Sequence, residues 1–299
     1  MKVPRTSCHT VKSEKANRHT TGDSEDEMNE KMNLEQLSEN WPEYNSKFTR
    51  DSVLLRFMSK KYFLDMINNS CNTLMHVSTW SDVYEGLIYK LKYYLKDNNG
   101  VYQSTSLNSL YKYYYGQCWS LLPYASEVLW NARCRKGDGV CIKTTVGKLA
   151  ANITAVMEPK WVGVACDLKR VKYRSSRGVK SFVNQMSNQQ VANAIQSSFP
   201  GLMGLFFVKR NEFSDEKEVR LLVSDPQQGA FVAGNSLVSY KVDKTNFLEE
   251  VILDPRMGRK TVSQIKKVVS KVGWLCNGQS LKVTQSDLYD FPPKDVYLD

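Results

Sequence analysis

Two glutamates stand two positions apart in the segment 213–222, Phe-Ser-Asp-Glu-Lys-Glu-Val-Arg-Leu-Leu. Glu216 and Glu218 lead into a run typical of a buried strand, where alternate residues point to the same face. Two carboxylates on one face repel each other unless a cation, a hydroxyl or a substrate meets them. Such a pair can stabilise the positive charge that develops when a sugar is cleaved at C1. The alternative is an exposed strand start whose glutamates pair with nearby cations, namely Lys209, Lys217 or Arg220.

Basic residues form two concentrations. Residues 169–180 contain six basic side chains and no acidic one: Lys169, Arg170, Lys172, Arg174, Arg177 and Lys180. Residues 256–271 contain the second set: Arg256, Arg259, Lys260, Lys266, Lys267 and Lys271. Such runs can bind phosphates through charge and, for arginine, through a bidentate fork. We take the first set as the candidate nucleic-acid-binding residues, with a solvated basic surface as the alternative.

Nine tyrosines lie between residues 84 and 115, interleaved with lysines. Aromatic rings beside lysines can form a platform on which bases stack. On an amphipathic helix, however, several of these rings would belong to the core. The spacing of Tyr84, Leu87, Ile88, Leu91 and Leu95 predicts such a helix, ended by Asn98-Asn99-Gly100.

The 299 residues carry 41 basic and 31 acidic side chains, a formal net charge of +10 that favours an anionic partner. No apolar run approaches the roughly 20 residues that a membrane-spanning helix needs, and no secretory signal is recognisable. Seven scattered cysteines without such a signal indicate reduced thiols, so we expect a cytoplasmic protein.

Residues 1–33 are polar, and their six basic and six acidic residues cancel. This segment is expected to be a disordered tail, followed by one α+β domain over residues 34–299. The order of expected elements lacks a regular βαβ alternation, which favours mixed or antiparallel sheets flanked by helices. Strands are expected at 53–58, 73–79, 139–144, 161–173, 219–223, 237–242 and 250–253. Helices are expected at 60–68, 179–198 and 261–272.

Several familiar site motifs are absent from the sequence. There is no phosphate-binding loop, no dinucleotide fingerprint and no nucleophile elbow. His9, His19 and His76 are the three histidines, and Cys134 and Cys141 lack zinc-knuckle spacing. We therefore expect no metal site.

Several segments, in the same order between Val53 and Leu253, resemble a bacterial family known as domain of unknown function 2971. They are Leu54–Phe57, Trp80–Gly86, Cys118–Ser120, Leu129–Trp130 running into Gly139–Ile142, Lys209 with Glu216–Arg220, and Glu250–Leu253. Val83 replaces a usual proline, and Ala132-Arg133 stands where a tyrosine is common. The resemblance carries no established activity. Within these segments Trp119 and Trp130 are candidate cofactor-binding residues.

The order Arg56, Ser120 and Glu216-x-Glu218 is similar to the Arg–Ser–Glu-x-Glu order of ADP-ribosyltransferases. That resemblance implies an ADP-ribosyltransferase-like fold and NAD as substrate. It implies that Arg56 holds NAD phosphate and that Ser120 braces the site. Glu218 would bind the nicotinamide ribose as the catalytic residue, and Glu216 would face the acceptor.

Three hypotheses follow. The first is an NAD-dependent ADP-ribosyltransferase or NAD glycohydrolase-like effector, with a nucleic-acid or protein acceptor and a role in phage defence or as a toxin. The second is a non-catalytic module that binds nucleic acid or nucleotides through the basic runs and tyrosines. The third is a Mg²⁺-dependent nuclease that uses four acids, Asp82, Glu85, Glu216 and Glu218.

Overall fold

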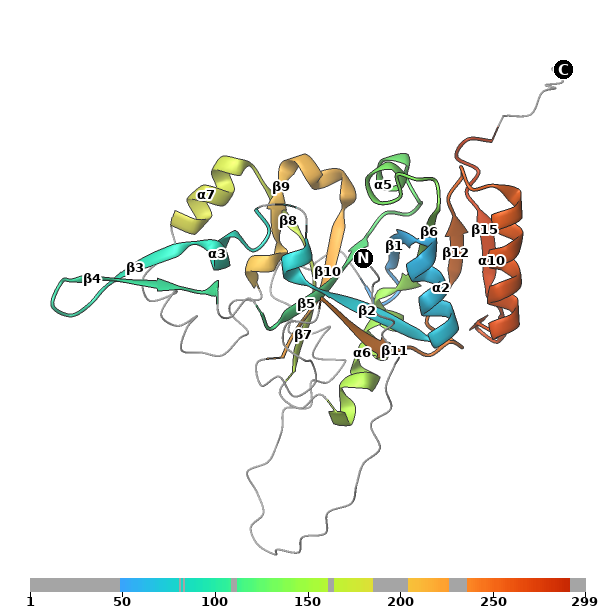
Figure 1. Ribbon diagram of the computed structural model, residues 1–299, viewed down its shortest axis with the longest axis horizontal. Helices are drawn as coiled ribbons and strands as arrows, with labels where there is room; N and C mark the ends of the chain where they lie inside the picture. Colours follow the sequence, from blue (N-terminus) through green and yellow to red (C-terminus); the bar gives the residue numbers. More distant parts are fainter. Residues whose placement is uncertain are drawn as a thin grey trace, which may run out of the picture.

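The computed structural model describes residues 49–80, 82, 84–108, 112–160, 164–184, 204–225 and 236–290. The expected tail, residues 1–33, lies outside this part of the chain, as does much of the helix expected at 179–198. Figure 1 shows a broad sheet with helices beside it and a long two-stranded arm at one end. The predicted α+β class, with a mixed sheet flanked by helices, is confirmed.

Nine strands form the main sheet, in the order β11-β2-β5-β1-β6-β12-β15, with β10 paired to β5 and β7 paired to β10. All of these pairs are antiparallel except β12 with β15. The strands are β1 (Val53–Ser59), β2 (Cys71–His76), β5 (Tyr114–Ser120), β6 (Gly139–Thr145), β7 (Ala165–Arg170), β10 (Glu218–Ser224), β11 (Leu237–Lys241), β12 (Glu250–Leu253) and β15 (Lys282–Gln285).

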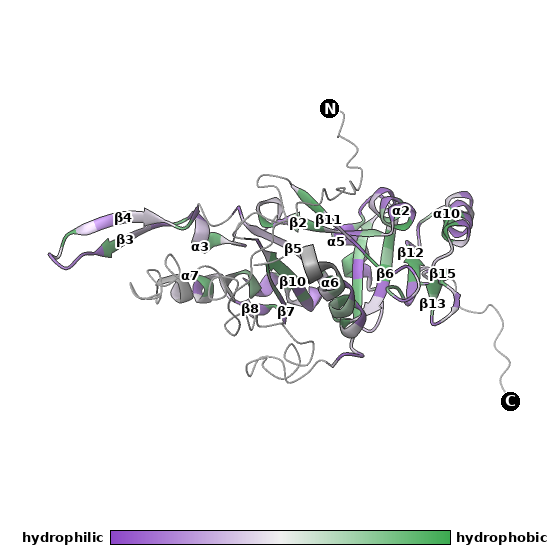
Figure 2. Ribbon diagram, turned by 90° about the horizontal axis from the view of Figure 1, so that it is seen from below, coloured by the Kyte–Doolittle hydropathy of each residue, from purple (hydrophilic) through white to green (hydrophobic). Residues whose placement is uncertain are grey.

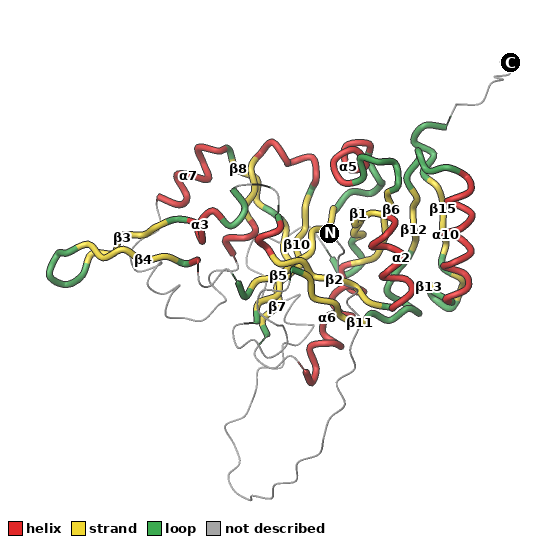
Figure 3. The backbone as a smooth tube through the Cα atoms, in the orientation of Figure 1, coloured by secondary structure: helices red, strands yellow, loops and turns green. Residues whose placement is uncertain are grey.

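Helices and short ribbons complete the described structure (Figure 3). The α-helices are α2 (Lys60–Asn69), α3 (Leu87–Lys90), α5 (Glu127–Arg133), α6 (Val146–Lys160), α7 (Ser176–Asn184) and α10 (Arg259–Val272). The 3₁₀ turns are η1 (Val77–Thr79), η2 (Gly204–Phe207) and η3 (Asn211–Glu216). The two-stranded ribbons are β3 (Lys92–Lys96) with β4 (Tyr102–Ser106), β8 (Lys172–Arg174) with β9 (Val208–Arg210), and β13 (Leu275–Cys276) with β14 (Gln279–Ser280). No helix in the described residues is long and apolar enough to cross a membrane.

Strand β5 is the centre of the sheet because it pairs with three neighbours. Its whole length pairs with β10, while its other edge is shared by β2, at Gly116, and β1, at Ser120. A Cβ at Gly116 would lie 2.8 Å from side-chain atoms of both Leu222 and Trp80, so this position requires glycine. The absence of a side chain here lets Leu222 of β10 and Trp80 pack directly against the backbone of β5.

Alternation along β1 separates the core into two clusters. Leu54 belongs to the larger cluster, which also contains Trp119 and Val219. Leu55, the next residue, belongs to a smaller cluster with Trp130 on α5. Successive strand residues point to opposite faces, so the sheet has an apolar layer on each side.

The segment expected to continue as a helix to Leu95 turns into a strand after Lys90. Helix α3 has four residues, and β3 and β4 then form a hairpin that projects from the body of the molecule (Figure 2). The helix prediction was wrong: in the run Lys-Tyr-Tyr-Leu-Lys exposed and half-buried residues alternate, which is the period of a strand. Aromatic residues favour strands, and Gly100, at φ 82°, supplies the turn.

Candidate active site

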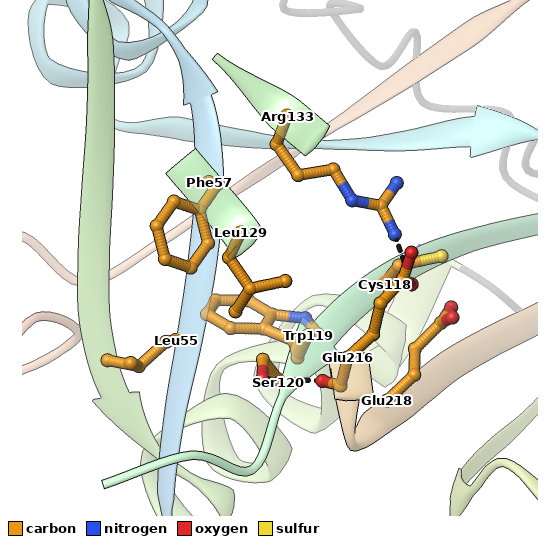
Figure 4. A pocket seen from close by; sticks show the side chains of 9 residues that line it. All are labelled: Leu55, Phe57, Cys118, Trp119, Ser120, Leu129, Arg133, Glu216 and Glu218. Carbon is orange, nitrogen blue, oxygen red and sulfur yellow. Dashed lines mark hydrogen bonds and ion pairs between the residues drawn. The ribbon is translucent and has the colours of Figure 1, made fainter. Parts of the chain in front are cut away.

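Three strands bring Ser120 and Glu218 to one face of the sheet. Ser120, the last residue of β5, lies opposite Leu55 of β1 on one side and Glu218 of β10 on the other. Residues directly opposite in an antiparallel pair point to the same face. Strand pairing therefore brings Ser120 and Glu218 side by side, although 98 positions separate them along the chain (Figure 4).

A tight turn carries both glutamates. The 3₁₀ turn η3 ends at Glu216, Lys217 adopts a left-handed conformation (φ 44°), and β10 begins at Glu218. The Ser120 hydroxyl donates to the backbone carbonyl of Glu216 at 2.6 Å, and the Leu121 amide donates to that of Lys217 at 2.9 Å. The end of β5 thus fixes the turn from which both carboxylates project.

Lys209, on β9, joins the two carboxylates. Its ammonium group donates to Glu216 at 2.8 Å and to Glu218 at 2.9 Å, and lies 3.6 Å from Glu85. The whole residue is 5% exposed. A cation between two carboxylates removes the repulsion that their spacing would otherwise cause.

Two arginines complete the cluster. Arg220, fully buried, donates to Glu218 at 2.7 Å and pairs with Glu85. Arg133, at the end of α5, donates to Glu216 at 2.7 Å, and its side chain is 37% exposed. The cluster therefore holds three cations and three anions: Lys209, Arg133 and Arg220 with Glu85, Glu216 and Glu218.

The charges of this cluster fix its protonation state. Burial alone would raise the pKa of Glu218, but Arg220 and Lys209 outweigh it and hold that pKa well below its usual value. Burial would likewise lower the pKa of Lys209, yet the carboxylates of Glu218 and Glu216 raise it. Glu218 is thus a permanent anion at neutral pH, suited to stabilising positive charge rather than to proton transfer.

A cavity of about 50 Å³ opens beside the cluster. Its lining residues are Leu55, Phe57, Cys118, Trp119, Ser120, Leu129, Arg133, Glu216 and Glu218. One wall is apolar and aromatic, and the other carries the two carboxylates (Figure 4). Sites for drug-sized ligands occupy roughly 300–1,000 Å³, and a cavity that binds benzene measures about 150 Å³. This cavity is therefore smaller than one aromatic ring, and a dinucleotide would lie mostly at its open side.

Arg56, the expected phosphate-binding residue, does not line the cavity. It follows Leu55 along β1 and therefore points to the opposite face from Ser120 and Glu218. Its guanidinium donates to the side chain of Asn72 at 2.6 Å and to the carbonyl of Thr73 at 3.2 Å. The structure thus uses Arg56 to bridge β1 and β2 where these strands diverge.

The two candidate tryptophans differ in position. Trp119, on β5, contributes to the cavity lining, but it precedes Ser120 along the strand, so its ring points to the opposite face, where the Arg56 guanidinium lies 5.8 Å from the ring centre. Trp130 is fully buried in the smaller core cluster, edge-on to Phe57 with ring centroids 4.8 Å apart, and does not line the cavity. A contact between Trp130 and a bound cofactor would require α5 to move.

The basic segment 169–180 divides between strand and helix. Three of its residues are exposed: Arg174, at the end of β8, and Arg177 and Lys180, on α7. Lys169 pairs with Asp167 and lies 5.6 Å from the ring centre of Phe207. Arg170 and Lys172 are half-buried. The exposed half remains our candidate for nucleic-acid contact.

The four acids of the nuclease hypothesis do not share one site. Asp82 pairs with Arg210 at 2.9 Å, whereas Glu85, Glu216 and Glu218 surround Lys209. In the described part of the chain, no group of three or more His, Cys, Asp or Glu side chains is arranged to hold a metal ion. A lysine ammonium occupies the position where Mg²⁺ would have to lie.

Sequence inspection did not single out Arg133 or Cys118 as site residues, and considered Lys209 only as an ion-pair partner. Cys118 faces the cavity, but burial and the charge of Glu218 raise the pKa of its thiol, so it is no thiolate nucleophile. One indication in the sequence pointed to a special role for Arg133: Ala132-Arg133 stands where a tyrosine is common in the family that the chain resembles. Nothing in the local sequence places that residue near Glu216.

Fold and site together define an α+β protein with a buried, charge-balanced cluster beside a small amphipathic cavity. No protein-family model and no curated protein matches the chain, so the resemblance to domain of unknown function 2971 is not confirmed. The chain is similar to solved structures of DarT from Thermus sp. 2.9. In complex with NAD⁺ the TM-score is 0.34 at 10% identity, covering 80% of this chain and 97% of DarT. In complex with ADP-ribosylated ssDNA the TM-score is 0.35 at 10% identity, covering 80% and 96%. So loose a likeness assigns no residue and no activity to this chain.

Proposed function

We propose that the chain is an NAD-consuming enzyme, an ADP-ribosyltransferase or NAD glycohydrolase, that breaks the nicotinamide–ribose bond beside Glu218. One observation carries the proposal: an ionised, buried carboxylate faces a cavity whose opposite wall carries the ring of Phe57. A flat pyridinium ring fits the aromatic wall, and a sugar C1 beside it would lie near the carboxylate. Such an arrangement suits cleavage through an oxocarbenium-like state.

In the proposed reaction the bond between ribose C1′ and the nicotinamide nitrogen breaks. Its electron pair goes to that nitrogen, so the pyridinium leaves as neutral nicotinamide. The positive charge that develops on the ribose is stabilised by Glu218, and water or an acceptor hydroxyl or amine then bonds to C1′ and releases a proton. Because the pKa of Glu218 is strongly lowered, that proton leaves to solvent or to another base.

The remaining residues would support this step. Ser120 holds the turn that carries Glu216, and Glu216 faces the acceptor side. Arg133, whose side chain is 37% exposed at the cavity, is our candidate for the phosphate contact that we expected of Arg56. Because the cavity measures only about 50 Å³, the nicotinamide end would lie at its open side, and the rest of NAD would lie outside it.

The test is release of nicotinamide from NAD, followed by chromatography, with and without a single-stranded oligonucleotide or a protein mixture as acceptor. Wild-type protein should release nicotinamide, and Glu218→Gln should release at least about a hundredfold less, the scale of one lost electrostatic contact. Glu212→Gln, at an exposed glutamate on η3, is the matched control. Equal background release by wild type and Glu218→Gln would refute the proposal, provided that both proteins melt cooperatively.

A role in phage defence or as a toxin in the cytoplasm accompanies this proposal. NAD depletion or modification of an essential acceptor would arrest growth of the producing cell. Expression in bacteria should therefore be toxic for wild type and tolerated for Glu218→Gln at equal protein level. Equal tolerance of both would count against this role.

A second candidate function is nucleic-acid binding without catalysis, favoured by three exposed basic residues at the end of β8 and on α7, namely Arg174, Arg177 and Lys180. Such binding would weaken steeply with salt and would be unchanged by Glu218→Gln.

A further inference from the structure

The hairpin formed by β3 and β4 presents one face made of lysines, tyrosines and serines. Residues directly opposite in the ribbon share a face, and the register pairs Lys92 with Ser106, Tyr94 with Ser104, and Lys96 with Tyr102. All six of these residues are exposed and none is acidic. We call them the hairpin face: Lys92, Tyr94, Lys96, Tyr102, Ser104 and Ser106.

The opposite face of the ribbon differs. Tyr93, Leu95 and Thr105 are half-buried there. Large apolar and aromatic area normally turns inward, yet Tyr94 and Tyr102 are 60% and 63% exposed. Their exposure is therefore a feature of the hairpin face and not of the ribbon as a whole.

The hairpin is anchored at its base and braced at its tip. Tyr89 and Leu107, which flank it, are fully buried, and Tyr89 stacks on Phe206 with ring centroids 4.8 Å apart. At the tip, the Asp97 carboxylate accepts hydrogen bonds from the amides of Asn99 and Val101, each at 2.9 Å. The acid of the turn is thus engaged locally, and the ribbon projects as a defined arm (Figures 1 and 2).

From these observations we infer that the hairpin face binds single-stranded nucleic acid. Lys92 and Lys96 would contact phosphates, and unpaired bases would stack on Tyr94 and Tyr102. These two tyrosines are diagonal neighbours across the ribbon, a spacing of roughly 7–8 Å between backbones that successive bases can bridge. Lys96 already lies over the Tyr102 ring, 5.9 Å from its centre, so charge and stacking surface coincide.

Charge and composition favour this partner over a membrane or a protein. The chain carries a net charge of +10, and the hairpin face adds two lysines without an acid. Membrane-surface elements insert Trp, Phe or Leu, whereas this face offers tyrosine and serine. Helix α7, with exposed Arg177 and Lys180, lies on the same side of the molecule (Figures 1 and 2).

This inference goes beyond the proposed function and is tested without NAD. Full-length protein is titrated into a fluorescein-labelled oligothymidylate of about 20 nucleotides, long enough for a hairpin-sized site, with anisotropy as readout. The double variant Tyr94→Ala/Tyr102→Ala should bind at least about tenfold more weakly. Tyr94→Phe/Tyr102→Phe keeps both ring faces and should bind within about threefold of wild type.

The matched control is Tyr62→Ala. Tyr62, on α2, is 52% exposed and also lies beside a lysine, with Lys61 5.5 Å from its ring centre. It belongs to another part of the structure, so its loss should leave oligonucleotide binding unchanged. Lys92→Ala/Lys96→Ala should make the dependence of log affinity on log salt shallower, by about 0.7 per lost phosphate contact.

Four results would overturn the inference. The tyrosine double variant could bind like wild type, or Tyr62→Ala could weaken binding equally. A blunt duplex of the same length could bind as tightly as the single strand, with no effect of the tyrosines. Binding to phosphatidylserine vesicles that depends on both tyrosines, without oligonucleotide binding, would instead assign the hairpin face to a membrane surface.

Discussion

The Ser120 hydroxyl donates a hydrogen bond of 2.6 Å to the backbone carbonyl of Glu216, across 96 positions of sequence. Both residues are buried, at 5% and 8% exposure. A buried carbonyl that loses its donor bears the cost of its desolvation. The bond therefore holds the turn of the glutamates against the end of β5.

Replacing Ser120 with alanine should consequently destabilise the fold and loosen the turn. We expect a loss of about 1–3 kcal/mol in the free energy of unfolding, measured by urea denaturation. Nicotinamide release should fall further than the change in folded fraction explains. Ser286→Ala, which removes the hydroxyl that accepts from the Leu288 amide at 3.4 Å in an exposed segment, is the control. An unchanged midpoint for Ser120→Ala would contradict this role of the hydroxyl.

Lys209 is the cation shared by three buried carboxylates, so its charge should matter more than its length. Lys209→Met keeps most of the apolar stem but leaves Glu216 and Glu218 with less compensation. Breaking a buried pair costs about 3–5 kcal/mol, and urea unfolding should register a loss of that size. Lys217→Met, at an exposed lysine of the turn that carries both glutamates, should change stability by less than about 0.5 kcal/mol.

A second substitution separates charge from packing at this position. Adding Glu216→Gln to Lys209→Met removes one of the uncompensated anions and should recover part of the lost stability. If the double variant were less stable than the sum of the two single changes predicts, lost packing and not charge would explain the effect.

The sequence was sufficient to predict those helices and strands whose residue pattern lies within the element itself. The helix expected at 261–272 exists because Val262, Ile265 and Val269 repeat at helical spacing and Gly273, at φ 75°, ends it. The strand expected at 250–253 was also confirmed. Strand β5 was missed because six of its seven residues are buried, which leaves no alternation to recognise.

The site was predictable only in part, because the order of residues along the chain does not show which face of the sheet each side chain points to. The order Arg56, Ser120, Glu218 suggested one shared site, and strand pairing places Glu218 opposite Ser120. Residue order could not show that Arg56 follows Leu55, the residue that lies opposite Ser120, and therefore points to the other face of the sheet. The Arg133–Glu216 pair spans 83 positions and depends on where α5 packs, which no local pattern encodes.

Acid should destabilise the protein through Glu218. The pKa of the Glu218 carboxyl is lower in the folded protein than in the unfolded chain, so the folded protein binds fewer protons there. Its contribution to the free energy of unfolding is therefore present above the pKa of an unfolded glutamate, about 4.3, and is lost as the pH falls below it. We expect the free energy of unfolding to decline below about pH 5. Glu218→Gln should be less stable than wild type at pH 7 and should lose less on acidification.

The measurement is urea denaturation at a series of pH values from neutral to about pH 3, the range in which an unfolded glutamate titrates. Glu212→Gln, at an exposed glutamate, should follow the wild-type profile. Parallel profiles for wild type and Glu218→Gln would mean that the cluster does not lower the pKa of Glu218 as its geometry implies.

The exposed basic residues at α7 should contribute to nucleic-acid affinity through charge alone. Arg177→Ala/Lys180→Ala should weaken binding of a single-stranded oligonucleotide and reduce the magnitude of the salt slope by about 0.7 per lost phosphate contact. Arg259→Ala/Lys260→Ala removes two cations that are also exposed, from the start of α10, and serves as the control. Because both double variants lower the net charge by two, equal effects would indicate general attraction to the basic protein, whereas a larger effect at α7 would locate the path of the strand.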